Sequence, residues 1–235
     1  MSTSRLALLA TFTATVAGVL VIGGPLLVQL GVLSGFLGFR LFGLGFLIGI
    51  LALLFGLFGL FATRPAKGRA GRRRAFGATL AGALIVGGVL AMAAPGLRVP
   101  PINDITTDPV DPPDFAASKR GAYSPEFAAQ QAEAYSDLAP IELPHSPAAS
   151  HTLVLETMRD FGWEIVRSEP DTGRIEATET SRVFRFVDDV VVRIRPTADG
   201  GSLVDVRSKS RDGKSDLGAN AARIRRLRDA LKSAS

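Results

Sequence analysis

Residues 41–62, LFGLGFLIGILALLFGLFGLFA, carry no charge and run directly into the cationic stretch TRPAKGRAGRRR, residues 63–74. An α-helix rises about 1.5 Å per residue, so roughly 20 apolar residues cross a hydrocarbon core of about 30 Å. Residues 6–30 and 75–97 are also uncharged and long enough to span. The sequence therefore predicts a transmembrane region over residues 1–97, built from a bundle of three helices.

The acidic residues divide the chain into two unlike parts. Residues 1–95 contain no Asp or Glu, so all 22 acidic residues lie in residues 96–235. The formal net charge of +5 comes from basic residues that flank the apolar spans, so it does not indicate a nucleic-acid partner. The absence of cysteine excludes disulfides, thiolate zinc sites and a cysteine nucleophile.

The basic stretch at residues 63–74 also predicts orientation. Short loops rich in Lys and Arg remain on the cytoplasmic side of a membrane, and this loop holds six positive charges and no negative one. We therefore expect a multi-pass protein of the cell (inner) membrane, with a cytoplasmic N-terminus and residues 98–235 on the non-cytoplasmic (periplasmic) side. A cleaved signal peptide is the alternative for residues 6–30, although that run is longer than a usual signal core and two spans follow it.

Small residues recur four positions apart in or beside the predicted spans. The pairs are Gly31–Gly35, Gly45–Gly49, Ala78–Gly82 and Ala83–Gly87. Such pairs let helix backbones approach closely in lipid, where no hydrophobic drive brings helices together. We expect them to pack the three helices against one another, with homo-oligomerisation through the Gly-rich spans as the alternative. No ionisable residue lies within the spans, so a channel or pump is not expected.

A Pro- and Asp-rich linker, residues 98–123, is predicted between the spans and a soluble domain over residues 124–235. Its five prolines restrict themselves and the residues before them to extended conformations. Its four aspartates lack the alternate-residue ligand spacing and the closing Glu of an EF-hand loop. We therefore expect a stiff, extended tether along the domain surface and no metal site.

The pattern of the soluble domain predicts an α+β fold. Ser-Pro pairs at 124–125 and 146–147 are typical of helix starts, because Ser caps free N–H groups and Pro pre-sets φ. Alternation and β-branched residues predict five strands, at 163–168, 173–180, 182–187, 190–196 and 202–210. An apolar stripe predicts a final helix over 216–233. This order favours an antiparallel sheet with flanking helices on one face, in a helix-grip-like arrangement.

The last two predicted strands are expected to form a hairpin. If Pro196 pairs with Ser202, the valines and isoleucine of both strands share one face, and Arg193 lies opposite Asp205 on the other. Opposite charges placed across a strand pair stabilise by about 0.2–1 kcal/mol, enough to help fix the register. Asp188-Asp189 just before the hairpin is expected to be a turn, with acid–base chemistry by the paired carboxylates as the alternative.

Three motifs of the soluble part resemble a known family. They are PPINDITTDP (100–109), DDVVVRIRP (188–196) and DVRSKSRDGKSDLGANAARI (205–224). The sequence is similar to the bacterial and plastid proteins grouped as domain-of-unknown-function family 1499, and the likeness covers most of residues 98–232. Some members of this family likewise carry hydrophobic spans ahead of the domain. The resemblance implies no activity, cofactor or catalytic residue.

The segment SKSRDGKSDLGAN, residues 208–220, is the candidate site. A polar, Gly-containing loop runs into a predicted helix start, where free N–H groups and the helix dipole favour anions. The sequence predicts a site for a phosphate, a carboxylate or an acidic headgroup, formed by Arg211, Lys214, Ser215, Asp216 and Asn220. In the structural alternative, Asp216 already supplies the negative charge at the helix start, and Arg207 and Arg211 pair with nearby Asp205 and Asp212.

No phosphate-binding loop and no Gly-x-Ser-x-Gly elbow occurs in the sequence. We predict no catalytic residue and no cofactor. The expected function is a membrane-anchored binding or assembly module for an envelope protein, a lipid or a small ligand. The alternatives are an envelope hydrolase with an unrecognised site, and a structural membrane protein whose spans recruit a partner. The lipid bilayer is an expected partner in every case.

Overall fold

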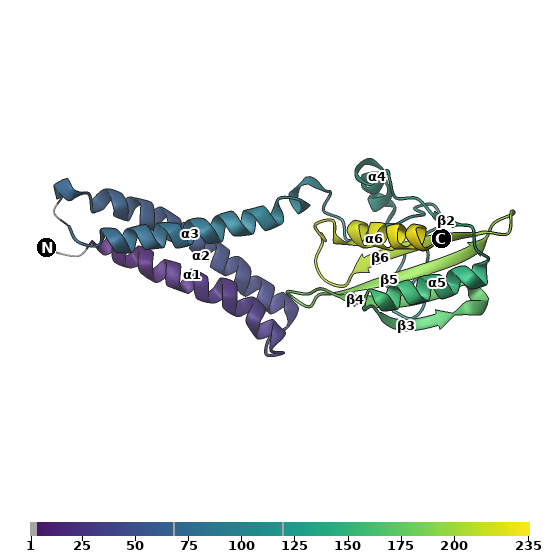
Figure 1. The fold of residues 1–235 in the computed structure, drawn as a ribbon. Helices are drawn as coiled ribbons and strands as arrows, with labels where there is room; N and C mark the ends of the chain where they lie inside the picture. Colours follow the sequence, from purple (N-terminus) through teal and green to yellow (C-terminus); the bar gives the residue numbers. More distant parts are fainter. Residues whose placement is uncertain (1–3, 68, 119) are drawn as a thin grey trace. The chain divides into compact units, whose positions relative to one another are not determined.

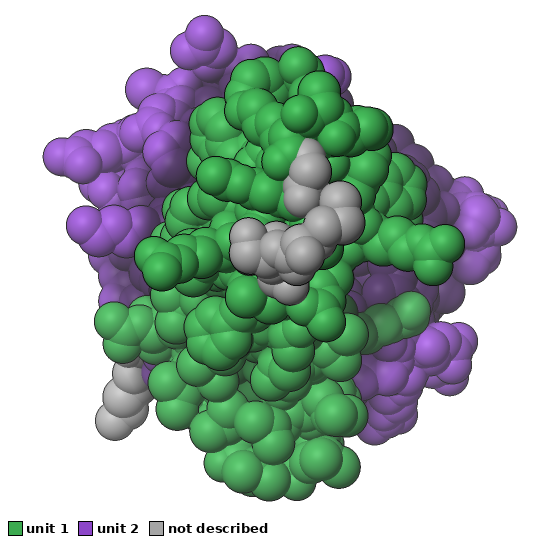
Figure 2. All heavy atoms as spheres, turned by 90° about the vertical axis from the view of Figure 1, so that its left-hand side faces the viewer, with its two compact units in different colours: residues 1–94, 182–185 green, residues 95–181, 186–235 purple. Residues whose placement is uncertain are grey.

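The structure is a computed structural model that describes residues 4–67, 69–118 and 120–235. It divides into two compact units, which are coloured separately in Figure 2. The helical unit comprises residues 1–94 and 182–185, and the sheet unit comprises residues 95–181 and 186–235. The main boundary, between Ala94 and Pro95, falls shortly before the first acidic residue of the chain, Asp104.

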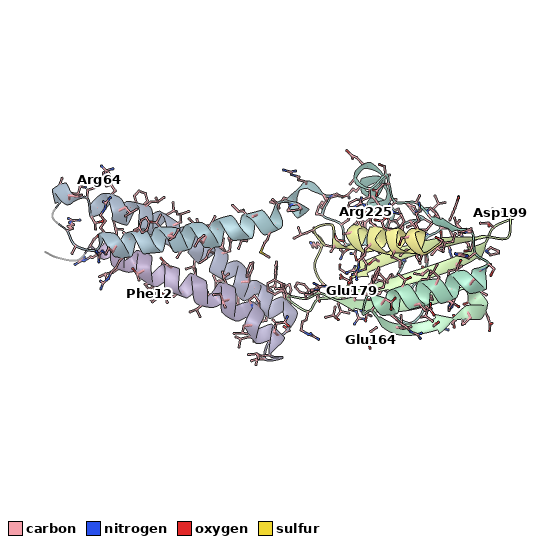
Figure 3. The ribbon with its side chains drawn as sticks, in the orientation of Figure 1. Phe12, Arg64, Glu164, Glu179, Asp199 and Arg225 are labelled. Atoms are coloured by element: carbon pink, nitrogen blue, oxygen red, sulfur yellow. The ribbon has the colours of Figure 1, made fainter. Side chains whose placement is uncertain are left out.

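Three long helices build the helical unit (Figure 1): α1 (Arg5–Gln29), α2 (Gly35–Ala62) and α3 (Arg72–Ala93), with a short 3-10 turn, η1 (Pro65–Lys67), before α3. Each helix is long and apolar enough to cross a bilayer, with mean hydropathies of 2.2, 2.6 and 2.0 over its most apolar stretch. This confirms the prediction of three apolar spans and indicates membrane association. Large apolar side chains face outward, as Phe12 does with 68% of its surface exposed (Figure 3).

Small residues let the three helices touch backbone to backbone. A Cβ placed on Gly82 of α3 would lie 2.6 Å from the backbone nitrogen of Leu53 in α2, so any larger residue there would force the helices apart. The pairs Gly45–Gly49 and Ala78–Gly82 are buried inside the unit, whereas Ala83–Gly87 is exposed on α3. Homo-oligomerisation through the spans stays a prediction.

The sheet unit is an antiparallel sheet with flanking helices (Figure 1), which confirms the α+β prediction. Its strands are β1 (Asp104–Thr106), β2 (Ile141–Leu143), β3 (Glu164–Glu169), β4 (Arg174–Thr180), β5 (Val187–Pro196) and β6 (Ser202–Ser210). The hydrogen-bonded order is β1-β6-β5-β4-β3, and β2 also pairs with β6. Its helices are α4 (Pro125–Ala134), α5 (Pro147–Asp160) and α6 (Ala219–Ala234), with 3-10 turns η2 (Gly96–Arg98) and η3 (Pro170–Thr172).

The alternation of β5 and β6 separates an apolar face of the sheet from a charged face. On the apolar face, Val192 meets Val206 and Ile194 meets Val204, in the predicted register. The helices α5 and α6 cover this face, and the buried side chains between them and the sheet are each 8% exposed or less. Burying one such aliphatic side chain contributes about 1.5–3 kcal/mol, so this filled layer holds the sheet unit together.

Two predicted features before the hairpin are wrong. The strand expected over residues 182–187 is absent, because the chain turns between β4 and β5, and Arg185 there has a positive φ of 51°. β5 begins at Val187 and contains Asp188 and Asp189, so these two residues lie in a strand rather than in a turn.

The last helix begins later than predicted, at Ala219 rather than at residue 216. Leu217 and Gly218 precede it with positive φ values of 54° and 87°, which a right-handed helix does not contain. The apolar stripe of α6 is buried at Ile224, Leu227 and Leu231, whereas Leu217, which lies ahead of the helix, is 52% exposed.

Candidate functional site

The charged face of the sheet is covered by the chain itself. The cover segment, defined as residues 107–118, follows β1 and lies over this face. The backbone N–H groups of Ala116 and Ala117 donate to the carboxylate of Glu176 in β4 at 2.8 and 3.0 Å. The guanidinium of Arg174 donates to the carbonyl of Asp114 at 2.6 Å. Both backbone N–H groups and a backbone carbonyl of the predicted linker are thus hydrogen-bonded to side chains of the sheet.

Arg207 of β6 lies at the centre of this covered face and is fully buried. Its Nε and Nη2 donate to the two carboxylate oxygens of Asp104 in β1, each at 2.9 Å, which is the bidentate geometry of a strong ion pair. Lys209 adds a second cation 3.0 Å from Asp104. Charges this deep are tolerated only when they are paired, because removing one partner leaves an uncompensated buried charge.

The Arg207 guanidinium also contacts residues of the cover segment and of the chain that follows it, by hydrogen bonds and by cation–π contacts with aromatic rings. Nη1 and Nη2 donate to the carbonyls of Pro113 and Gly121, each at 3.1 Å. The rings of Phe115 and Tyr123 lie 5.0 and 5.7 Å from the guanidinium carbon, within the range of cation–π attraction. Arg207 therefore fastens this stretch of chain to β6.

Tyr123 has an altered proton affinity in this environment. Burial, together with the negative charge of Asp104, raises the pKa of Tyr123 to about 12, and the nearby Arg207 opposes the shift. The Tyr123 hydroxyl donates to Gln131 of α4 at 3.1 Å, and Gln131 exchanges two hydrogen bonds with the backbone of Thr106 in β1. The phenol is thus a neutral structural donor at physiological pH.

Other buried carboxylates of the charged face are held in the same way. Asp189 accepts hydrogen bonds from Arg120 at 2.6 Å and from Arg211 at 2.7 and 3.0 Å. Asp205, which is fully buried, accepts from two arginines of β5 at 2.8 to 3.0 Å. A carboxylate whose oxygens are occupied in this way can act as a general base only if a partner moves away.

The histidine, aspartate and glutamate side chains are the candidates for a metal site, and the histidines are also candidates for acid–base catalysis. In the part of the chain that the structure describes, no group of three or more His, Asp or Glu side chains converges as a metal site. His151 is buried in the first turns of α5, and its Nε2 lies 3.4 Å from the hydroxyl of Ser168. That contact ties a core histidine to β3.

The predicted anion-binding loop is only partly assembled in the structure. Arg211 is committed to Asp189 by two hydrogen bonds. Lys214 is exposed, and the Ser215 hydroxyl accepts a long 3.4 Å hydrogen bond from the N–H of Leu217. The two predicted cationic side chains therefore differ in availability: only Lys214 is open to an external anion.

Asp216 occupies the start of the last helix as the structural alternative expects. Its two carboxylate oxygens accept from the N–H groups of Gly218 and Asn220, both at 2.8 Å. Burial raises the pKa of this carboxyl above its usual value. An external anion would have to displace the Asp216 carboxylate from these N–H groups. The anion site stays a prediction.

One comparison with known proteins identifies the domain. The model of a protein family of unknown function (DUF1499) matches residues 104–231. The chain belongs to the DUF1499 family. No curated protein matches the chain. The DUF1499 match begins at Asp104, the partner of Arg207, so the family domain contains the whole cover segment and the paired charges beneath it.

A second buried cluster of the DUF1499 domain escaped prediction. Arg223 of α6 is 7% exposed and donates to Asp188, to Glu179 (labelled in Figure 3) and to Asn220. Asn220 is fully buried, and its side-chain oxygen also accepts from the Ser208 hydroxyl at 2.7 Å. The missed signal was Asp188, which continues the inward alternation of β5 and supplies a charge at the end of the core.

Proposed function

We propose that the DUF1499 domain of this chain is a non-catalytic binding and assembly module that meets an envelope protein at its outer surface. One observation carries the proposal: large apolar side chains fill the layer between sheet and helices, where Met158, Ile224 and Leu227 are each at most 1% exposed. A small ligand held between sheet and helix needs an open cavity there. The occupied carboxylates of the charged face likewise favour a rigid scaffold over acid–base chemistry.

The cover segment offers such a module a preformed contact point. Val110 is 95% exposed at its tip, and the side chain of Asp108 fixes the turn by accepting from the N–H groups of Val110 and Asp111 at 3.2 and 3.0 Å. Arg193 anchors Asp111 in turn at 2.8 Å. A surface that is already ordered loses little conformational entropy when a partner binds.

The test is photo-crosslinking in living cells with the full-length chain. A photoreactive amino acid replaces Val110, and the matched control replaces Asp199, which is exposed at the turn between β5 and β6 (Figure 3). A discrete protein adduct from position 110 and none from position 199 supports the proposal. A stoichiometric small molecule that co-purifies inside the domain, or hydrolysis of envelope material by the pure protein, would overturn it.

We further propose that this module lies on the non-cytoplasmic side of the cell membrane. The six basic residues of the stretch 63–74, which joins α2 to the first turn of α3, support this orientation, because short cationic loops stay in the cytoplasm. A reporter enzyme that is active only outside the cytoplasm, fused after Ser235, should be active. Activity of a cytoplasm-dependent reporter at the same position would reverse the orientation and leave the binding proposal to be tested on the other side.

A further inference from the structure

Leu217 is an exposed apolar residue in an unfavourable backbone conformation. Its φ of 54° lies in the left-handed region, where a side chain carries a steric penalty, and 52% of its surface is exposed. Burial in the fold therefore does not account for a leucine here. Glycine or asparagine would fit this backbone more easily and would leave no apolar surface in water.

Leu217 lies directly against the point where the chain leaves the last span. A Cβ placed on Gly96 would lie 2.4 Å from the Cβ of Leu217 and 3.0 Å from its carbonyl oxygen, so these two residues touch. α3 ends at Ala93, and three residues of extended chain reach at most about 11 Å. By chain connectivity alone, Leu217 is confined to the neighbourhood of the membrane surface.

The neighbours of this contact have the character of an interfacial surface. Leu97 in η2 is 69% exposed, and the exposed cations Arg98 and Lys214 flank the two leucines. Neither cation makes an ion pair with any residue that the structure describes. The exposed Asp212 of the loop offsets one positive charge, so apolar contact is the larger contribution and charge the smaller one.

We infer that Leu217 and Leu97 insert into the headgroup region of the bilayer and form a membrane contact of the sheet unit, in addition to the three spans. Arg98 and Lys214 then contact phosphate groups of anionic lipids. The occupant is a lipid surface, so the inference stands or falls separately from the protein partner proposed above.

The absence of cysteine in the native chain allows a single-site test. The full-length protein is reconstituted into vesicles of equal parts phosphatidylcholine and phosphatidylglycerol that carry a nitroxide quencher at the headgroup. A fluorophore is attached at Ser215→Cys, two residues from Leu217, and at Val166→Cys on β3 as the control. Val166 is 50% exposed and Ser215 is partly exposed, so a probe at either position is accessible from solvent.

We expect quenching at position 215 and none at position 166. Leu217→Asn should abolish the quenching at 215 while the unfolding midpoint of the domain stays the same or rises, because asparagine tolerates the left-handed backbone better than leucine. Absence of quenching at 215, or quenching that survives Leu217→Asn, overturns the inference. A lowered midpoint in Leu217→Asn would also overturn it, because it would assign the leucine to packing within the fold.

Discussion

Arg207→Met measures how strongly the buried charges hold the cover segment in place. The substitution removes four hydrogen bonds, two to Asp104 and one each to the carbonyls of Pro113 and Gly121. It leaves a carboxylate whose side chain is 1% exposed with Lys209 as its nearest cation. Breaking a buried ion pair from one side costs about 3–5 kcal/mol. The free energy of unfolding of a typical domain is about 5–15 kcal/mol, so this loss is a large share of it.

The assay follows denaturant unfolding of the full-length protein in detergent by tryptophan fluorescence. Trp163 is the single tryptophan of the chain and is 4% exposed in the sheet unit, so its signal reports the unit that contains Arg207. The exposed pair Arg167–Glu169 provides the control, and Arg167→Met should cost about 1 kcal/mol or less.

A double variant makes the reasoning refutable. Asp104→Leu combined with Arg207→Met replaces both charges by apolar groups and should recover most of the lost stability, since paired replacement of buried ions is often neutral or stabilising. If Arg207→Met lowers the free energy of unfolding by less than about 1 kcal/mol, or if the double variant loses as much as the single one, the charged core does not secure the cover segment.

Three further predictions use the same fluorescence readout. Gly96→Ala should destabilise by about 1–3 kcal/mol, because its Cβ would meet Leu217 at 2.4 Å; Arg167→Met again serves as the control. Burial raises the pKa of Tyr123 to about 12 in the folded state, above the unfolded value of about 10, so its neutral form adds stability that is complete below pH 10 and lost between about pH 10 and 12. Tyr123→Phe should remove that alkaline loss in a pH series, while Tyr135→Phe, which deletes a buried hydroxyl without a partner among the described residues, should be neutral or stabilising at neutral pH. Asp216→Ala should cost about 0.5–2 kcal/mol as a lost helix cap, and an unchanged unfolding midpoint would contradict its bonds to the start of α6.

The parts of the fold that follow from periodicity could be predicted from the sequence. The three spans need only uninterrupted apolar length, and the hairpin of β5 and β6 needs only alternation and a short connection, so its register was correct. The strand expected over residues 182–187 shows the limit of that reasoning. Its alternation resembles a strand, yet the positive φ of Arg185 turns the chain, and composition carries no signal for that.

The charged face could not be predicted, because alternation assigns charges to solvent by default. It placed Arg207 on the face away from the core, which is correct, but it could not show that the cover segment would bury that face. Burial of Arg207 and Arg223 depends on contacts that span 103 and 35 positions of the chain. The candidate anion-binding loop stays a prediction. The commitment of Arg211 to Asp189 could not be foreseen, because it depends on a pairing between residues distant in the sequence.

The short passage from α3 to η2 limits how far this domain can travel. Twenty-six residues of extended leash, the length of the segment 98–123, would allow a reach of roughly 90 Å. β1 and the cover segment occupy much of that length within the fold, and only Ala94 and Pro95 separate the last span from η2. A domain on so short a connection can move laterally with its spans but stays within a thin layer at the membrane. Its effective concentration is therefore high for partners that are also held at the membrane. A freely diffusing partner gains no such advantage and must first reach that layer.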